Sequence, residues 1–196
     1  MTQIVRPDAR YQRSYLEATD EFAGAHRDGD GDMAQEADPA TGFAGFAFTR
    51  EGLADPEEFR RFVRQRRSEE LPETPRPSGR VPCTFLWVVD GDEYLGSIAF
   101  RHALNDFLLR EGGHVGYSIR PSARRRGHAS TALRQVLELA AEMGHERVLL
   151  TCDEDNIASR AIIEGVGGEY EDSRVGTRRY WVPTIATDRP AGARIS

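Results

Sequence analysis

The stretch from Gly113 to Ala129 constrains the fold of this chain more than any other. Val115, Tyr117 and Ile119 alternate along the chain as the apolar residues of a β-strand do. Pro121 has no backbone N–H to donate, so it ends that strand. After a short basic turn, apolar residues recur at helical spacing, and a glycine follows the last of them. The pattern predicts a strand, a basic turn and a helix in direct succession.

The turn between this strand and this helix has the features of an anion-binding site. The first N–H groups of a helix have no partner inside the helix, and the helix dipole places partial positive charge there. Gly127 has no side chain, so a ligand can approach the backbone closely. Arg124, Arg125 and Arg126 add cations, and a guanidinium can bind a phosphate with two hydrogen bonds. The stretch therefore predicts a site for a small anion.

The same residues resemble a known signature. The pattern Ile119-x-Pro121-x-x-Arg124-x-x-Gly127-x-Ala129 is similar to the acetyl-CoA signature of the GNAT acetyltransferase superfamily, Gln/Arg-x-x-Gly-x-Gly/Ala after a strand. A second match lies at Asn156, where the superfamily commonly has an asparagine that binds the pantetheine arm. The resemblance implies that acetyl-CoA is bound by these residues: Tyr117, Ser118, Ile119, Arg124, Arg125, Arg126, Gly127, His128, Ala129, Ser130, Asn156 and Ser159. The alternatives are an ordinary basic turn and an asparagine that only caps a helix.

The resemblance implies an α/β (α+β) fold with a central, mixed, mostly antiparallel twisted sheet of about seven strands, one parallel βαβ pair and about four flanking helices. Strands are expected at 3–5, 84–89, 94–100, 115–119, 147–152, 169–175 and 178–182, and helices after Asp8, Asp55, Gly127 and Asn156. We expect one domain over residues 1–185, with an acidic loop at 28–52, a proline-rich connection at 68–82 and a mobile tail at 186–196.

Two charged segments have a structural and a functional interpretation. Eight carboxylates lie between Glu17 and Asp38 against one arginine, Arg27. They form either a solvated loop or an acidic lip that attracts a cationic amine. The helix expected after Asp55 has an apolar face of Phe59, Phe62 and Val63, and its arginines are expected on a solvated face: Arg60, Arg61, Arg64, Arg66 and Arg67.

No residues in the sequence have the spacing of a metal site. The run from Asp28 to Asp32 resembles the opening of a calcium loop, but Met33 stands where that loop needs a glycine and Pro39 where it needs a carboxylate. Cys83 and Cys152 lie in or beside expected strands, and we interpret them as free thiols with apolar surroundings.

The composition argues against several classes of partner. A net charge of −6 argues against nucleic acid as the main partner. No apolar run approaches the roughly 18 residues that a membrane span requires. The N-terminus lacks the apolar segment of a signal peptide, so we expect a cytoplasmic protein. The last strands, with an exposed Tyr180 and Trp181, are either a possible seam of a homodimer or part of the core.

For the reaction, the resemblance implies direct attack of an amine on acetyl-CoA while both are bound. In the superfamily the two parallel strands splay apart, and a backbone N–H near Ile119 would polarise the thioester carbonyl. Relatives often place a tyrosine acid at the position of Ile163, so the usual proton donor is missing here. Candidates for the base are His114, whose ordinary pKa suits neutral pH, and Glu154; a base acting through ordered water is the alternative.

The acceptor is open to several interpretations. A cationic small molecule, such as a polyamine or an aminoglycoside, fits the acidic segment, while a protein N-terminus, a lysine side chain or an amino acid are alternatives. Tyr170, Tyr180 and Trp181 are expected to frame the acceptor together with that segment. Two other functions compete with catalysis: a non-catalytic acyl-CoA sensor and a phosphate-binding regulatory module.

Overall fold

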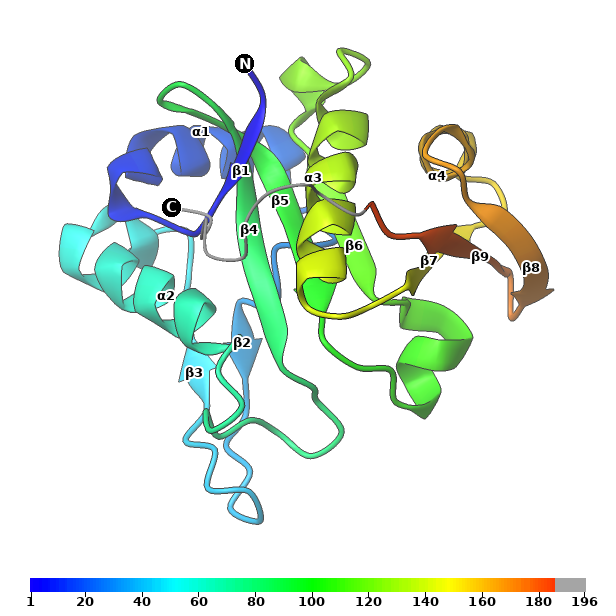
Figure 1. Ribbon diagram of the computed structural model, residues 1–196. Helices are drawn as coiled ribbons and strands as arrows, with labels where there is room; N and C mark the ends of the chain where they lie inside the picture. The colour runs from blue at the N-terminus through cyan, green and yellow to red at the C-terminus, as the bar shows by residue number, and fades with distance from the viewer. Residues whose placement is uncertain (186–196) are drawn as a thin grey trace.

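The central sheet has seven strands in the order β1-β4-β5-β6-β7-β9-β8 (Figure 1). The computed structural model describes residues 1–185, and the tail expected at 186–196 lies outside the described residues. The strands are β1 (Gln3–Val5), β4 (Cys83–Asp90), β5 (Glu93–Arg101), β6 (Val115–Ile119), β7 (Arg147–Asp153), β8 (Glu169–Arg174) and β9 (Thr177–Pro183). The pair β6–β7 is parallel and every other neighbouring pair in the sheet is antiparallel. The predicted fold class is confirmed.

Four α-helices cover the two faces of this sheet: α1 (Gln12–Phe22), α2 (Pro56–Ser68), α3 (His128–Glu142) and α4 (Ile157–Gly165). Short 3-10 turns lie at Ala9–Tyr11, Gly52–Ala54 and Pro121–Ala123, and a short π-helix at Leu108–Gly112. The start of α2 follows from its sequence. The Asp55 carboxylate accepts hydrogen bonds from the N–H groups of Glu57 and Glu58, both at 2.9 Å, and Pro56 occupies the first helical position.

Alternation along the strands divides the apolar residues between two cores. Leu86 and Val88 of β4 pack on the face that α3 covers, whereas Trp87 and Val89 pack with residues of α1 and α2 on the opposite face. Figure 1 shows α3 crossing in front of the sheet, with α1 and α2 to its left and α4 beside β9 and β8. The loop between β6 and α3 therefore lies at the edge of the layer that α3 forms.

The segment expected as a loop at 28–52 contains a short antiparallel pair, β2 (Ala34–Gln35) and β3 (Phe46–Ala47), which projects below the sheet in Figure 1. Most of its acidic residues, and those of the preceding helix, have partners within the protein. Ion pairs or hydrogen bonds join Asp20 to Arg50, Glu21 to Arg120, Asp28 to His26, Asp30 to Arg27, Asp32 to Arg80 and Asp38 to Ser78. The expectation of a solvated acidic loop is wrong for Asp30, which is only 2% exposed.

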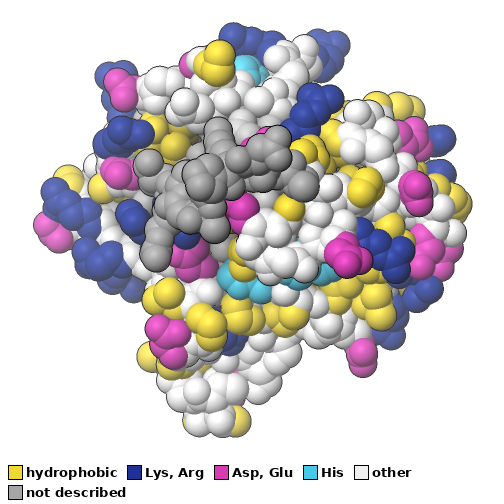
Figure 2. All heavy atoms as spheres, in the orientation of Figure 1, with side chains coloured by type: hydrophobic (Ala, Val, Ile, Leu, Met, Phe, Trp, Pro, Cys, Tyr) yellow, Lys and Arg dark blue, Asp and Glu magenta, His cyan; other side chains and the backbone are white. Residues whose placement is uncertain are grey.

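The arginines of α2 do not all lie on a solvated face. Arg60 and Arg61 form surface ion pairs with the helix's own glutamates, and Figure 2 shows basic and acidic side chains side by side at the left edge of the molecule, where Figure 1 places α2. Arg66 is different, because it is only 2% exposed and lies over the rings of Phe62 and Phe85. Its position one turn beyond Phe62 puts it on the buried stripe, so the expectation for this arginine is wrong.

One expectation for the C-terminal part is also corrected. Tyr180 is fully buried in β9, which lies between β7 and β8, so this ring cannot be an exposed seam for a homodimer. In α4 the buried residue is Ile163, while Ala158 and Ala161 are exposed. Within residues 1–185, no helix is long and apolar enough to cross a membrane, and no group of acidic, histidine or cysteine residues could hold a metal ion.

Candidate active site

A cavity of about 730 Å³ lies between β6, the turn after it and the start of α4. We call it the turn cavity. Of the predicted cofactor-binding residues, it is lined by Tyr117, Ser118, Ile119, Arg124, Arg125, Gly127, His128, Ala129, Ser130, Asn156 and Ser159. Arg126 is exposed and does not line it. The turn after β6 and the start of α4, about 30 residues apart in sequence, thus line the same cavity, because the β6–α3–β7 unit places the ends of its two parallel strands side by side.

The turn presents free backbone N–H groups to this cavity. Thr131 donates the first hydrogen bond of α3, to the Gly127 carbonyl at 3.0 Å, so the amides just before it, at His128, Ala129 and Ser130, have no partner in the helix. Gly127 has φ of 83°, and a Cβ there would meet no protein atom within 4 Å. Arg125 has φ of 59°, a backbone conformation that costs energy for a residue with a side chain and that concentrates at functional sites.

The parallel strands β6 and β7 separate beside the cavity. Their ladder consists of one pair of residues, Val115 and Leu150. Arg120 donates to the Leu95 carbonyl of β5, and because hydrogen bonding alternates along an antiparallel strand, the amides of Tyr117 and Ile119 point away from β5. These two amides face the gap between β6 and β7, where no described strand pairs with them. The splay expected from the resemblance is confirmed.

Two buried polar atoms on the cavity wall have no hydrogen-bond partner among the described residues: Ser118 Oγ and His128 Nε2. The His128 ring is 7% exposed, and its other nitrogen, Nδ1, is 2.8 Å from the Thr2 hydroxyl. An unsatisfied buried polar group costs about 1–3 kcal/mol, so native proteins rarely leave one without a ligand or water. Both residues line the turn cavity, so a polar group bound there would lie near these two atoms.

The far wall of the cavity is the start of α4. Asn156 caps the helix, because its Oδ1 accepts from the Ser159 N–H at 3.0 Å, and its side-chain NH₂ has no partner in the described part of the chain. Tyr117 reaches across the gap, with its hydroxyl 2.9 Å from Ser159 Oγ. Burial raises the pKa of Tyr117 to about 12, so the phenol stays protonated at neutral pH. Ile163 is fully buried and does not line the cavity.

The structure does not bring the two proposed bases to this cavity. His114 is 5% exposed, and its Nδ1 accepts a hydrogen bond from the Leu149 N–H at 2.9 Å. Burial, followed by the neighbouring His145 and Arg101, lowers the pKa of His114 to about 4. Glu154 is exposed in the turn after β7 and does not line the cavity. These contacts favour a structural role for His114, and its role as a base stays a prediction.

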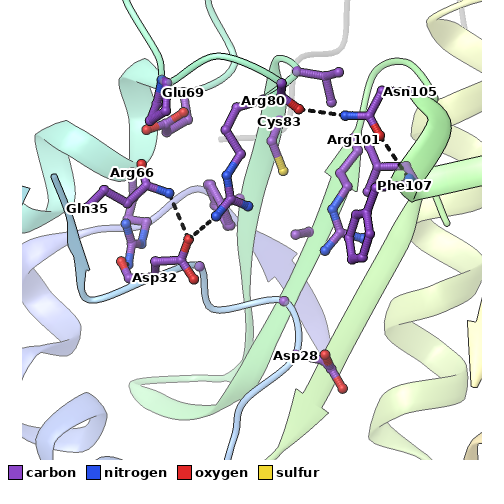
Figure 3. Close-up of a pocket in the computed structure, with 18 of the residues that line it drawn as sticks. Asp28, Asp32, Gln35, Arg66, Glu69, Arg80, Cys83, Arg101, Asn105 and Phe107 are labelled. Atoms are coloured by element: carbon purple, nitrogen blue, oxygen red, sulfur yellow. Dashed lines mark hydrogen bonds and ion pairs between the residues drawn. The ribbon is translucent and has the colours of Figure 1, made fainter. Parts of the chain in front are cut away.

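A second cavity, of about 490 Å³, adjoins the first. We call it the arginine cavity, because Arg66, Arg80 and Arg101 line it (Figure 3). The two cavities share two lining residues, His26 and Asp28, whose side chains are joined by a contact of 3.1 Å between Nε2 and Oδ1. Tyr170, Tyr180 and Trp181, expected to frame the acceptor, line neither cavity.

Sequence reasoning missed this histidine–aspartate pair because a buried network places it. The Asp30 carboxylate accepts from the Tyr15 hydroxyl at 2.8 Å and the Ser97 hydroxyl at 2.7 Å, and it pairs with Arg27 at 2.6 Å. These contacts hold the loop of residues 26–32 between α1 and β5. A Cβ added to Gly29 would lie 2.4 Å from the Gly116 carbonyl oxygen, so the loop packs directly on β6.

A further ion pair fixes the turn on α1. Arg120 is 6% exposed and pairs with Glu21, which also accepts from the N–H and the hydroxyl of Ser122 at 3.1 and 3.0 Å. The hydrogen bonds from Arg120 lower the pKa of Glu21 from 4.5 to about 2, against the opposing effect of burial.

The Glu21 contacts predict a defined acid sensitivity. Because the pKa of Glu21 is lower in the folded protein, its stabilisation is present above about pH 4.5 and is lost as the pH falls toward 2. We expect Glu21→Gln to be less stable than the wild type at neutral pH and to lose less stability across that window. Urea unfolding at a series of pH values measures this difference, and parallel pH profiles for the two proteins would refute it.

Comparison with known proteins identifies similar sequences and folds. Residues 25–169 match the model of a family described as "Acetyltransferase (GNAT) domain". The structure is similar to RimL, a ribosomal L7/L12 alpha-N-protein acetyltransferase in complex with coenzyme A, with a TM-score of 0.57 and 14% identity over 95% of this chain and 96% of that one. It is similar to MccE, a microcin C7 self-immunity acetyltransferase in complex with acetyl-CoA and AMP, with a TM-score of 0.57 and 13% identity over 93% and 92%.

A third similar structure is RimJ from Mycobacterium smegmatis, in complex with CoA-disulfide. Its TM-score is 0.61, with 14% identity over 93% of this chain and 81% of that one. At such identities the likeness concerns the fold alone. Comparison with curated proteins found no match.

Proposed function

The chain belongs to the GNAT acetyltransferase family, and on this premise we propose that it transfers the acetyl group of acetyl-CoA to an amine, with both bound together. One observation carries the proposal: the turn cavity gathers eleven of the twelve residues that the resemblance assigns to coenzyme A. Solved structures of similar fold contain coenzyme A or acetyl-CoA, which supports the same ligand here.

The residues of the turn cavity fit such a ligand. The free amides of His128, Ala129 and Ser130 and the arginines of the turn bind the pyrophosphate, as a helix N-terminus with added cations does. The amides of Tyr117 and Ile119 pair with the extended pantetheine arm, which takes the place of a strand between β6 and β7. The unsatisfied Ser118 Oγ and His128 Nε2 offer further polar contacts on the same wall.

The chemistry follows from residues that line this cavity. Acetyl-CoA supplies an activated thioester, and the Ile119 N–H donates to its carbonyl oxygen as negative charge develops there. Asp28 accepts the proton that the attacking amine gives up, with His26 as its hydrogen-bonded partner. A C–N bond forms while the C–S bond breaks. Tyr117 donates a hydrogen bond to the departing sulfur, a task that Ile163 cannot perform.

Titration calorimetry tests the cofactor assignment. We expect acetyl-CoA to bind with one site per chain and 3′,5′-ADP to bind more weakly, because only coenzyme A carries the pantetheine arm. Equal affinities would favour a simple phosphate-binding module and refute the proposal.

Acetyl transfer itself is measured by the release of the coenzyme A thiol. This assay has a low background, because the sequence contains no lysine that the protein could acetylate on itself.

The role of Tyr117 predicts a defined loss of activity. We expect Tyr117→Phe to lower kcat by about 100-fold, because the leaving sulfur loses its hydrogen-bond donor, while the affinity for acetyl-CoA changes little. Thiol-release kinetics with a saturating amine give kcat, and calorimetry gives the affinity. Tyr170→Phe is the control, since that hydroxyl lies on exposed β8, 3.1 Å from Ser173 Oγ. A kcat within about threefold of the wild type would remove Tyr117 from the mechanism.

A further inference from the structure

The arginine cavity meets the turn cavity where the reaction is proposed to occur. His26 and Asp28 line both spaces. A Cβ added to Gly116 would lie 3.7 Å from the Asp28 Cβ and 3.6 Å from Arg101 Nη2, so both side chains are close to this glycine. Gly116 immediately precedes Tyr117 on β6, so both side chains lie against the strand that borders the turn cavity. A molecule in the arginine cavity could therefore present one end to the acetyl group.

The charges lining the arginine cavity are only partly compensated by the protein. Arg27 pairs with Asp30, and Arg80 pairs with Asp32 at 2.5 Å. Figure 3 shows this second pair, with Gln35 donating to the same carboxylate. Arg66 and Arg101 make no ion pair with a carboxylate among the described residues. Neither guanidinium group therefore has a carboxylate partner within ion-pair distance in the described part of the chain.

The contacts of these two arginines leave donors unused. Arg66 donates to Gln65 Oε1 and to the Asp32 carbonyl, both at 2.6 Å, but its buried Nε has no partner in the part of the chain described. Arg101 donates through Nη1 to the carbonyls of Gly112 and Gly113, at 2.8 and 3.2 Å. Neutral carbonyls do not balance a guanidinium charge, and an unpaired buried charge is costly.

Three carboxylates line this cavity with Arg66, namely Asp28, Asp32 and Glu69. Glu69 accepts from the Gln65 side chain at 2.6 Å, and burial raises its pKa, against the opposing effects of Arg66 and Arg76. Glu69 forms no ion pair with Arg66 in the described residues. Cys83 also lines the cavity, and burial raises the pKa of its thiol to about 12, so it is no nucleophile at neutral pH. The cavity therefore holds binding groups and no reactive thiolate.

We infer that the arginine cavity is the acceptor site and that the acceptor is a small amine which also carries an anionic oxygen group, a carboxylate or a phosphate. The inference rests on the proposed acetyl transfer. The amine end lies at Asp28, next to the turn cavity, and the anionic end pairs with Arg101 and Arg66. A cavity of about 490 Å³ suits a small molecule. Because most carboxylates of the acidic segment have partners within the protein, the segment as a whole offers little to a purely cationic acceptor.

Matched pairs of acceptors test the inference. Glycylglycine is compared with glycylglycinamide, and phosphoethanolamine with ethanolamine, with putrescine as a purely cationic amine; all are assayed by thiol release from acetyl-CoA. We expect kcat/KM for the anionic member of at least one pair to exceed that of its neutral partner by about tenfold or more. The pair that shows the preference distinguishes a carboxylate from a phosphate.

Variants of Arg101 separate recognition from structure. We expect Arg101→Gln to raise KM for the preferred anionic acceptor by about tenfold, because the ion pair is lost, and to remove most of the preference over the neutral partner. Arg101→Lys should restore part of the preference. Arg66→Gln should act in the same direction, with Arg64→Gln as the control, since Arg64 is exposed on the same helix and lines neither cavity.

The outcomes are distinct. A preference for the anionic acceptors that Arg101→Gln abolishes supports the inference. Equal rates within both pairs, fastest turnover of putrescine, or no turnover of any of the five amines while acetyl-CoA still binds would overturn it and leave the cofactor site standing. If calorimetry detects no binding of acetyl-CoA, the proposed function and this inference fall together.

Discussion

Replacing Asp30 with alanine is expected to lower the free energy of unfolding by about 3–5 kcal/mol, because it leaves a buried arginine without its counter-charge. The side chain of Arg27 is only 10% exposed, and its partner Asp30 is 2% exposed. The hydroxyls of Tyr15 and Ser97 lose their shared acceptor in the same variant. At about 2–4 °C per kcal/mol, the melting temperature should fall by roughly 10 °C.

Two further variants calibrate this prediction. Asp30→Asn keeps part of the hydrogen bonding and should lose less stability than Asp30→Ala. Glu36→Ala removes an exposed carboxylate from the same acidic segment and should change the unfolding free energy by about 0.5 kcal/mol or less. Chemical denaturation measures all three. A loss below about 1 kcal/mol for Asp30→Ala would show that the network does not anchor the loop.

Gly29→Ala is expected to lower kcat/KM for acetyl transfer by about 100-fold, because it displaces the loop that carries His26 and Asp28. A Cβ at this position would lie 2.4 Å from the Gly116 carbonyl oxygen and 3.0 Å from Ile98 Cα, so backbone has to move. The φ of 82° adds strain for any residue with a side chain. The loop cannot shift without moving Asp28, which lines the turn cavity.

Gly24→Ala is the matched control for this variant. Gly24 has φ of 81°, nearly the same as Gly29, but a Cβ there would meet nothing within 4 Å. It should lose about 1 kcal/mol of stability from backbone strain and keep its activity. If both variants kept wild-type kinetics, the position of the loop on β6 would not matter for the reaction.

Local sequence signals were sufficient for the strand, the turn and the start of α3, whereas the resemblance implied that Asn156 and Ser159 join them. The alternation ending at Ile119, the arginines of the turn and Gly127 act on neighbouring backbone, so their effect can be predicted from spacing. Asn156 was open to two interpretations, and the structure confirms the cap through Ser159 while its NH₂ remains available for a ligand. These features depend on hydrogen bonds within one turn of chain, which a sequence displays directly.

The junction of the two cavities could not be predicted in this way. His26 and Asp28 reach it because Asp30 bonds to α1 and β5, contacts that join residues 15 and 67 positions apart. A carboxylate in an acidic run has no local feature that distinguishes a buried anchor from a solvated side chain. The histidine that the sequence did favour, His114, is held by a backbone N–H of β7 instead.

Arg66 is an intermediate case. Its spacing of three and four residues from Val63 and Phe62 placed it on the apolar stripe of α2, but its residue type favoured the solvated face. The spacing was the better guide, since Arg66 is buried between aromatic rings. An arginine at a buried helical position is itself a signal of an unusual environment, here the wall of the arginine cavity.

The central claim is that coenzyme A binds in the turn cavity against β6 and the N-terminus of α3. Titration of coenzyme A into ¹⁵N-labelled protein, followed by backbone amide chemical shifts, tests this directly. The account predicts saturable shifts that are largest at Tyr117, Ile119 and residues 128–130, with little change at residues 59–63 of α2. Shifts confined to other parts of the molecule, or no saturable shift at all, would contradict it.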